Sequence, residues 1–144
     1  MSNVDRGRSF QLAVKDALER RSGIVFDLEV ALPVGDPPKP HTFDFASPDK
    51  HYVGEAKAFT WTTTGNVPSA KITGLREALN YLRLLPSSTA TFLVVKRDYH
   101  PRRRETLGEY FVRLNRNLLG NVAILELPEA GGELQLVWGT FPSR

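Results

Sequence analysis

The stretch from residue 51 to residue 59, HYVGEAKAF, puts two charged side chains into a sequence that otherwise has the pattern of a strand. Charged residues are depleted from strand interiors, and burying an unpaired charge costs several kcal/mol. Side chains two apart share one face of a strand, so Glu55 and Lys57 project together. We therefore expect a central strand whose small residues pack under a helix and whose charged pair lies in a cleft. The small residues on the opposite face are Gly54, Ala56 and Ala58.

A third charge is expected to face the same way on the preceding strand, residues 42–46. Asp44 lies between Phe43 and Phe45, so it points away from the face that those rings bury. The turn sequence SPDK joins the two strands into a hairpin, which brings Asp44 toward Glu55. Two carboxylates about 4 Å apart repel each other by about 1 kcal/mol in water, and by more when desolvated. The alternative is a salt-bridge cluster on an exposed sheet face.

A divalent cation between these carboxylates would remove the repulsion. Oxygen ligands of this kind select Mg²⁺ or Mn²⁺, with water and substrate phosphate at the remaining positions. Lys57 on the same face could hold the attacking water and offset charge in the transition state. The charged set therefore suits metal-assisted phosphodiester hydrolysis.

The rest of the sequence predicts the order α-β-β-β-α-β-α-β-β in a single domain over residues 1–144. Asp5 is the expected N-cap of the first helix, Gly23 its stop, and Ser69 the cap of the second helix. The proline-rich segment PVGDPPKP, residues 33–40, is expected to be a loop. The fold class is α/β, a mixed sheet flanked by helices. The first expected helix spans residues 5–21. The second begins at residue 69 and has an apolar stripe of Ile72, Leu75, Leu79 and Leu82, and the third spans residues 106–118 with Leu107, Tyr110, Phe111, Leu114 and Leu118 facing inward. The remaining strands are expected at residues 24–32, 90–95, 122–127 and 134–138.

Composition narrows the class of protein. The chain has no cysteine, which excludes disulfides and thiolate metal sites, and its three histidines lack metal-ligand spacing. No apolar run is long enough to span a bilayer, and MSNVDRGRSF has no apolar signal region, so the expected location is cytoplasmic. The net charge is +3 with clustered cations, a pattern that suits a polyanion partner such as nucleic acid. Taken alone, such charge runs favour a solvated surface, so the cluster only supports the expected DNA partner.

Asp44, ten intervening residues and then Glu55-Ala56-Lys57 resemble the D…(D/E)-x-K signature of the PD-(D/E)XK nucleases, which share the restriction-endonuclease-like fold. The predicted element order over residues 5–97 is similar to the core of that fold. The resemblance implies that Asp44 and Glu55 bind Mg²⁺ or Mn²⁺ and that the backbone carbonyl of Ala56 adds a ligand. It also implies that Lys57 assists the nucleophile.

The run Gly7-Arg8-Ser9-Phe10-Gln11 resembles the G-x-x-F-E run that places a glutamate near the metals in that family. By this resemblance Gln11 joins the catalytic site. Glutamine offers a carbonyl oxygen without a charge, which implies a weaker or water-mediated metal contact. The proline that gives the family its name is absent, because Phe43 precedes Asp44.

Several residues are candidates for binding nucleic acid. Arg102, Arg103 and Arg104 precede the third helix and are expected to contact backbone phosphates. Lys71 could reach a phosphate, or be an ordinary surface lysine. Trp61 could stack on a base, as exposed aromatic residues do in single-strand binders, or be buried in the core.

The expected function is that of a Mg²⁺-dependent deoxyribonuclease, of endonucleolytic, restriction or junction-resolvase-like type. Small members of this fold often dimerise, so a homodimer is a further expectation by family analogy. One alternative is a non-catalytic nucleic-acid-binding module that retains the fold, which the glutamine at position 11 supports. Another is an assembly protein without nucleic acid, against which the clustered arginines argue. No membrane partner is expected.

Overall fold

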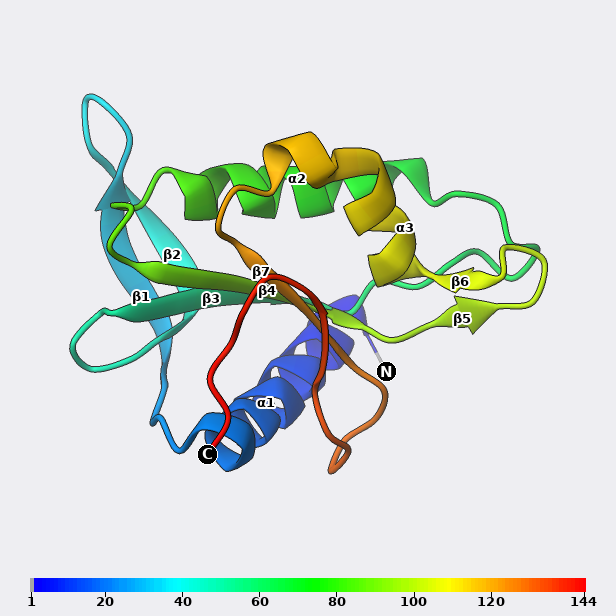
Figure 1. The fold of residues 1–144 in the computed structure, drawn as a ribbon, viewed down its shortest axis with the longest axis horizontal. Coiled ribbons are helices and arrows are strands. Elements are labelled where there is room, and N and C mark those ends of the chain that lie inside the picture. Colours follow the sequence, from blue (N-terminus) through cyan, green and yellow to red (C-terminus); the bar gives the residue numbers. More distant parts are fainter. Residues whose placement is uncertain (1) are drawn as a thin grey trace.

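A six-stranded mixed sheet forms the centre of the molecule in the computed structural model, which describes residues 2–144 (Figure 1). The spatial order is β1-β2-β3-β4-β7-β8. The β3–β4 and β4–β7 pairs are parallel and the others antiparallel, so the predicted α/β class with a mixed sheet is confirmed. The charged strand β3 is central, as predicted. The strands are β1 (Asp27–Val34), β2 (Lys39–Ala46), β3 (Tyr52–Lys57), β4 (Ala90–Lys96), β7 (Ala123–Leu127) and β8 (Gln135–Trp138).

Helices cover both faces of the sheet. Figure 1 shows α1 (Asn3–Ser22) on one face, with α2 (Ser69–Arg83) and α3 (Leu107–Asn115) on the other. An apolar core lies on each side of the sheet, because every helix buries one stripe of side chains against it. A short 3₁₀ helix, η1 (Arg116–Leu118), extends α3. No helix within residues 2–144 has the length and apolar character needed to cross a membrane.

The small residues of β3 face α1, as predicted, but one of them makes room for a ring. Ala56 packs in the α1 core. A Cβ atom on Gly54 would lie 2.1 Å from a carbon of the Phe92 ring on the neighbouring strand. Glycine is therefore required at position 54 by the close approach of Phe92.

The proline-rich segment is only partly a loop, so that prediction is wrong at its ends. The β1–β2 ladder continues through the pairs Pro33↔Pro40 and Val34↔Lys39, and the turn occupies only residues 35–38. The prolines are tolerated because β1 is an edge strand and β2 pairs with β3 only at Phe45 and Ala46. The same edge position leaves the inward residues of β1 half-buried, where the alternation predicted a well-buried face.

The helix boundaries differ from the predicted ones by a few residues. Ser2 rather than Asp5 caps α1, since its Oγ accepts the Asp5 N–H at 3.1 Å. Gly23 ends α1 in the left-handed conformation, φ 74°, as predicted. The α2 helix has Pro68 at its N-cap and no side-chain cap from Ser69.

The third helix is shorter than predicted and presents a different face. Thr106 and Glu109 form a capping box at its start. Its buried stripe follows Leu107, Phe111 and Asn115, four residues apart, whereas Leu114 and Leu118 are exposed. The inward position of those two leucines was therefore wrong.

Two short strands, β5 (Tyr99–His100) and β6 (Glu105–Thr106), form a separate ribbon that the sequence did not predict. We call residues 97–106 the β5–β6 arm; it extends to the right of the sheet in Figure 1. Hydrogen bonds attach it to the loop after β3, two of them through the side chains of His100 and Arg102. His100 Nε2 lies 3.0 Å from the Thr63 carbonyl, and Arg102 Nη1 donates to the Thr64 carbonyl at 3.0 Å.

Candidate active site

Asp44 lies where the β2–β3 ladder ends. The ladder pairs only Phe45 with Gly54 and Ala46 with Val53, and Asp44 comes next along β2. Its Oδ2 accepts the backbone N–H of Ala56 at 2.8 Å. The carboxylate thus takes the place of a ladder hydrogen bond, which fixes it between the two strands.

Glu55 faces Asp44 from β3 and is buried, with only 5% of its surface exposed. Burial raises the pKa of Glu55 to about 9, helped by a hydrogen bond to the Asp44 carboxyl and by the Asp44 charge. The positive charge of Lys57 opposes this rise without cancelling it. The Glu55 carboxyl therefore carries a proton at neutral pH, and that proton relieves the repulsion expected between the two carboxylates.

Lys57 ends β3 on the same face as Glu55 and is half-buried. Its positive charge acts to lower the pKa of both Glu55 and His41. Within residues 2–144 the Lys57 ammonium takes part in no ion pair. A cation without a fixed partner beside a protonated carboxyl is free to act on an anionic substrate.

His41 belongs to the site although sequence reasoning missed it. Its Nε2 lies 3.1 Å from Oε1 of Glu55. The imidazole is stacked on the Tyr81 ring of α2, with centroids 3.7 Å apart and planes 9° apart, and meets the Phe43 ring edge-on. Burial, followed by the Lys57 charge, lowers the pKa of His41. His41 has no partner at metal-ligand spacing in the sequence, so no local motif marked it, and its contact with Glu55 is visible only in the structure.

Gln11 reaches the site from α1. The side chain is buried, and its Nε2 donates to the Asp44 backbone carbonyl at 3.4 Å and to Asp44 Oδ1 at 3.5 Å. The structure therefore brings Gln11 to Asp44, and none of the hydrogen bonds described for residues 2–144 joins it to Glu55 or Lys57. The amide nitrogen of Gln11 faces Asp44, and its carbonyl oxygen makes no contact there.

Trp61 is buried in the structure, so the predicted role in stacking on a nucleic-acid base is wrong. Only 5% of its surface is exposed. Its backbone N–H donates to Asp98 Oδ2 at 2.8 Å, and its indole Nε1 donates to the Glu105 carbonyl at 3.3 Å. The Arg103 guanidinium lies 4.9 Å from the indole centroid. These contacts fix the ring between the loop after β3 and the β5–β6 arm.

The three arginines of the arm have different environments. Arg102 bonds to the Thr64 carbonyl, and Arg103 lies over the rings of both Trp61 and Tyr110. Arg104 is exposed, with a positive φ of 56°. Lys71 is also exposed, on the first turn of α2. None of the contacts described for residues 2–144 joins these four cations to the Asp44–Glu55 pair.

The donor set at this site is small. In the part of the chain that the structure describes, no group of three or more His, Cys, Asp or Glu side chains is arranged to hold a metal ion. Asp44 and Glu55 offer two carboxyl groups, with the Gln11 amide and the Ala56 backbone beside them. Mg²⁺ commonly binds through one or two carboxylates and fills its shell with water and substrate phosphate, so the chemistry of this set fits a cation of that kind.

Comparisons of the chain with protein-family models, with curated proteins and with solved structures gave no match.

Proposed function

We propose that this protein is a divalent-metal-dependent nuclease that hydrolyses phosphodiester bonds in DNA, and that its sheet and helices form a restriction-endonuclease-like fold. The observation that carries the proposal is the buried carboxyl group of Glu55 beside the half-buried Asp44, whose Oδ2 accepts the neighbouring Ala56 N–H at 2.8 Å, with Lys57 on the same face of β3 as Glu55. Burying the Glu55 carboxyl group beside a second carboxyl group costs stability. A site that keeps this arrangement in a sheet centre is typical of function rather than of packing.

Each residue has a role that follows from its contacts. The Ala56 N–H fixes Asp44, and His41 holds one oxygen of Glu55, so both carboxyl groups are oriented before a ligand arrives. A bound Mg²⁺ would be held by Asp44 and Glu55 and would supply the positive charge that favours the ionised form of both carboxyl groups and polarises a substrate phosphate. Lys57 is placed to orient the attacking water and to offset negative charge that develops on the phosphate.

DNA is the substrate that the charge distribution favours. The net charge is +3, and the β5–β6 arm adds exposed arginines to the loop that follows the charged strand. Cations that project from such an arm suit contacts with backbone phosphates, which position a strand without reading its sequence. A homodimer with two such sites would cut both strands.

The second candidate function is a nucleic-acid-binding module without catalysis. The observation that favours it is the Gln11 amide, which donates to Asp44 where an acidic residue would have completed a three-carboxylate set. In that case Asp44 serves to join β2 to β3 through its bond to the Ala56 N–H. The two candidates differ in whether a divalent cation binds.

Cleavage of supercoiled plasmid in Mg²⁺, in Mn²⁺ and in EDTA tests the proposal. Cleavage should need the metal and should be lost in Asp44→Asn and Glu55→Gln. Lys57→Met should bind Mn²⁺ but cut about 10²–10³-fold more slowly, the typical loss for one electrostatic stabiliser. Asp27→Asn is the matched control, because it removes an exposed carboxylate at the start of β1.

Mn²⁺ titrations followed by melting temperature separate the two candidates. Saturable stabilisation of the wild type that Glu55→Gln abolishes is expected for the nuclease. A wild-type protein that binds DNA, shows no metal-dependent shift and cuts no substrate would establish the binding module instead.

A further inference from the structure

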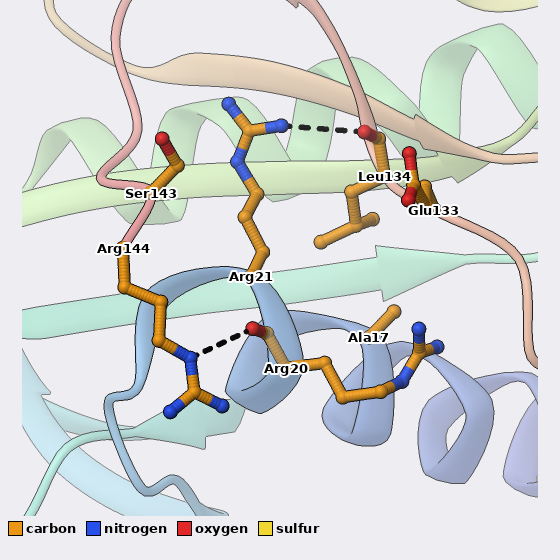
Figure 2. A pocket seen from close by; sticks show the side chains of 7 residues that line it. All are labelled: Ala17, Arg20, Arg21, Glu133, Leu134, Ser143 and Arg144. Carbon is orange, nitrogen blue, oxygen red and sulfur yellow. Dashed lines mark hydrogen bonds between the residues drawn. The ribbon is translucent and has the colours of Figure 1, made fainter.

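A polar concavity lies at the opposite end of α1 from Ser2, where the last helical turn meets the C-terminal segment and the β7–β8 connection (Figure 2). Its volume is about 290 Å³. Three arginines and one glutamate line it, together with the hydroxyl-bearing Ser143. The charged residues are Arg20, Arg21, Arg144 and Glu133.

Backbone carbonyls hold each arginine in place. Arg20 Nη2 donates to the Gly132 carbonyl at 3.0 Å, and Arg21 Nη1 donates to the Leu134 carbonyl at 3.3 Å. Arg144 Nε donates to the Arg20 carbonyl at 3.1 Å, a bond that is drawn in Figure 2. A guanidinium has five N–H donors, so each arginine keeps further donors after these bonds are made.

The positive charge of the concavity is only partly balanced. Arg20 pairs with Asp16 at 3.0 Å. Within residues 2–144 no ion pair involves Arg21, Arg144 or Glu133. The Nε of Arg21 is buried without a hydrogen-bond partner, which is costly for a donor on a charged group.

The negative end of the α1 dipole, which would repel an anion, is largely covered. The Arg144 backbone N–H bonds to the Arg21 carbonyl at 2.8 Å, and the Gly23 N–H bonds to the Glu19 carbonyl. With the Arg20 carbonyl bonded to Arg144 Nε, three carbonyls of the last turn have partners. The arginine charges therefore dominate the local field.

We propose that this concavity is a binding site for a phosphate group. Planar guanidinium forks match phosphate oxygens in pairs, and fixed arginines lose little freedom when they bind. The Ser143 hydroxyl adds a neutral donor at the rim, and the volume admits one phosphate group with part of what it is attached to. The site is separate from the proposed catalytic centre, because Gln11 and Arg21 stand ten residues apart on α1, about 15 Å along its axis.

Calorimetric titration with inorganic phosphate at constant ionic strength tests the site. The wild type should bind phosphate saturably at one site per chain. Arg21→Gln and Arg144→Gln should each raise the dissociation constant for phosphate by about tenfold or more. Arg116→Gln, which removes an exposed arginine on η1, is the matched control and should leave affinity unchanged. Glu133→Gln should tighten binding.

Absence of saturable binding to the wild type would overturn the proposal, as would equal weakening by the Arg116 control. If an arginine variant fails to fold, Glu133→Gln carries the test, because it disturbs none of the bonds that hold the arginines. Unchanged affinity in Glu133→Gln would then count against the site.

Competition with DNA identifies the source of the phosphate. A labelled duplex in EDTA is titrated with inorganic phosphate, using the wild type and Arg144→Gln. Displacement at the wild type's phosphate dissociation constant, lost in Arg144→Gln, would mean that the site holds a DNA phosphodiester. Phosphate binding without displacement would mean that it holds a small phosphorylated compound. Neither result depends on DNA cleavage, so this test can fail while the nuclease proposal holds, and the reverse.

Discussion

His41 and Glu55 are joined across the β2–β3 hairpin by a 3.1 Å contact between Nε2 and Oε1, while Tyr81 stacks on the imidazole from α2. The contact occupies one oxygen of Glu55, and the pKa of the same carboxyl group is raised by burial and by the neighbouring Asp44. His41 therefore acts as a positioning residue that links α2 to the carboxyl pair.

We predict that His41→Ala weakens Mn²⁺ binding by about tenfold, as loss of a group that orients a metal ligand typically does. His41→Gln keeps a side-chain amide that can bond to Glu55 and should recover part of the affinity. Tyr81→Phe keeps the stacked ring and is the control. Mn²⁺ affinity by calorimetry is the measurement; equal affinity in the alanine variant and the wild type would show that Glu55 does not need His41.

The pKa of Glu55 predicts how stability depends on pH without metal. Its folded value, about 9, lies above the ordinary value of 4.5, so the folded state favours the proton. The stabilisation is complete below about pH 4.5 and is lost as pH rises toward 9, at about 1.4 kcal/mol per pKa unit as an upper limit. Glu55→Gln has no proton to lose. In EDTA, its melting temperature relative to wild type should therefore rise between pH 5 and pH 9, whereas Asp27→Asn should show no such trend.

The sequence predicted β3 and its charges well because a strand fixes which side chains share a face. Gly54 and Ala56 lie on one face of β3, and Glu55 and Lys57 lie on the other. Small residues on the first face predicted a helix packed against it, and therefore a central position for the strand in the sheet. The same local pattern says nothing about partners on other strands. His41 was therefore invisible as a neighbour of Glu55 until the register was known.

The parts that the sequence did not predict depend on long-range contacts or on very short elements. The β5–β6 arm has two residues per strand, too few for a periodic pattern, and it is held by bonds to a loop 37 residues earlier in the chain. The residue type of Trp61 was compatible with either a buried position or an exposed one that stacks on a base. Its burial follows from contacts with Asp98, Glu105 and Arg103, which no local pattern indicates.

Gly54→Ala should destabilise the protein strongly. The added Cβ would lie 2.1 Å from the Phe92 ring, which is itself fully buried and packed against Phe26 and Phe45. Overpacking of this kind costs about 1–3 kcal/mol. Gly7→Ala is the opposite control, because a Cβ added there would meet nothing within 4 Å and alanine favours the helix by about 1 kcal/mol. Urea unfolding should show the two changes with opposite signs.

Arg103 and Arg104 are adjacent but should respond differently to substitution. Arg103 covers the rings of Trp61 and Tyr110, so Arg103→Ala should lower the melting temperature. Arg104 is exposed, so Arg104→Gln should leave stability unchanged and weaken DNA binding at every sequence. The slope of log affinity against log salt should fall by about one unit for the lost contact. An unchanged slope would show that Arg104 does not reach a phosphate.

Gln11→Glu should make the stability of the protein depend more strongly on metal. The wild-type amide donates to the Asp44 backbone carbonyl and to Oδ1, and a carboxylate at this buried position would lose both bonds and add repulsion beside Asp44. Without metal, the melting temperature should therefore fall. With Mn²⁺, three oxygen ligands would replace two, so affinity should rise and the metal-induced stabilisation should exceed that of the wild type. Gln11→Leu, which also loses both hydrogen bonds but adds no charge, is the matched control and should lose stability without gaining metal affinity. If Gln11→Glu and Gln11→Leu bind Mn²⁺ equally, position 11 lies outside the reach of the metal, and Gln11 serves only to bond α1 to β2.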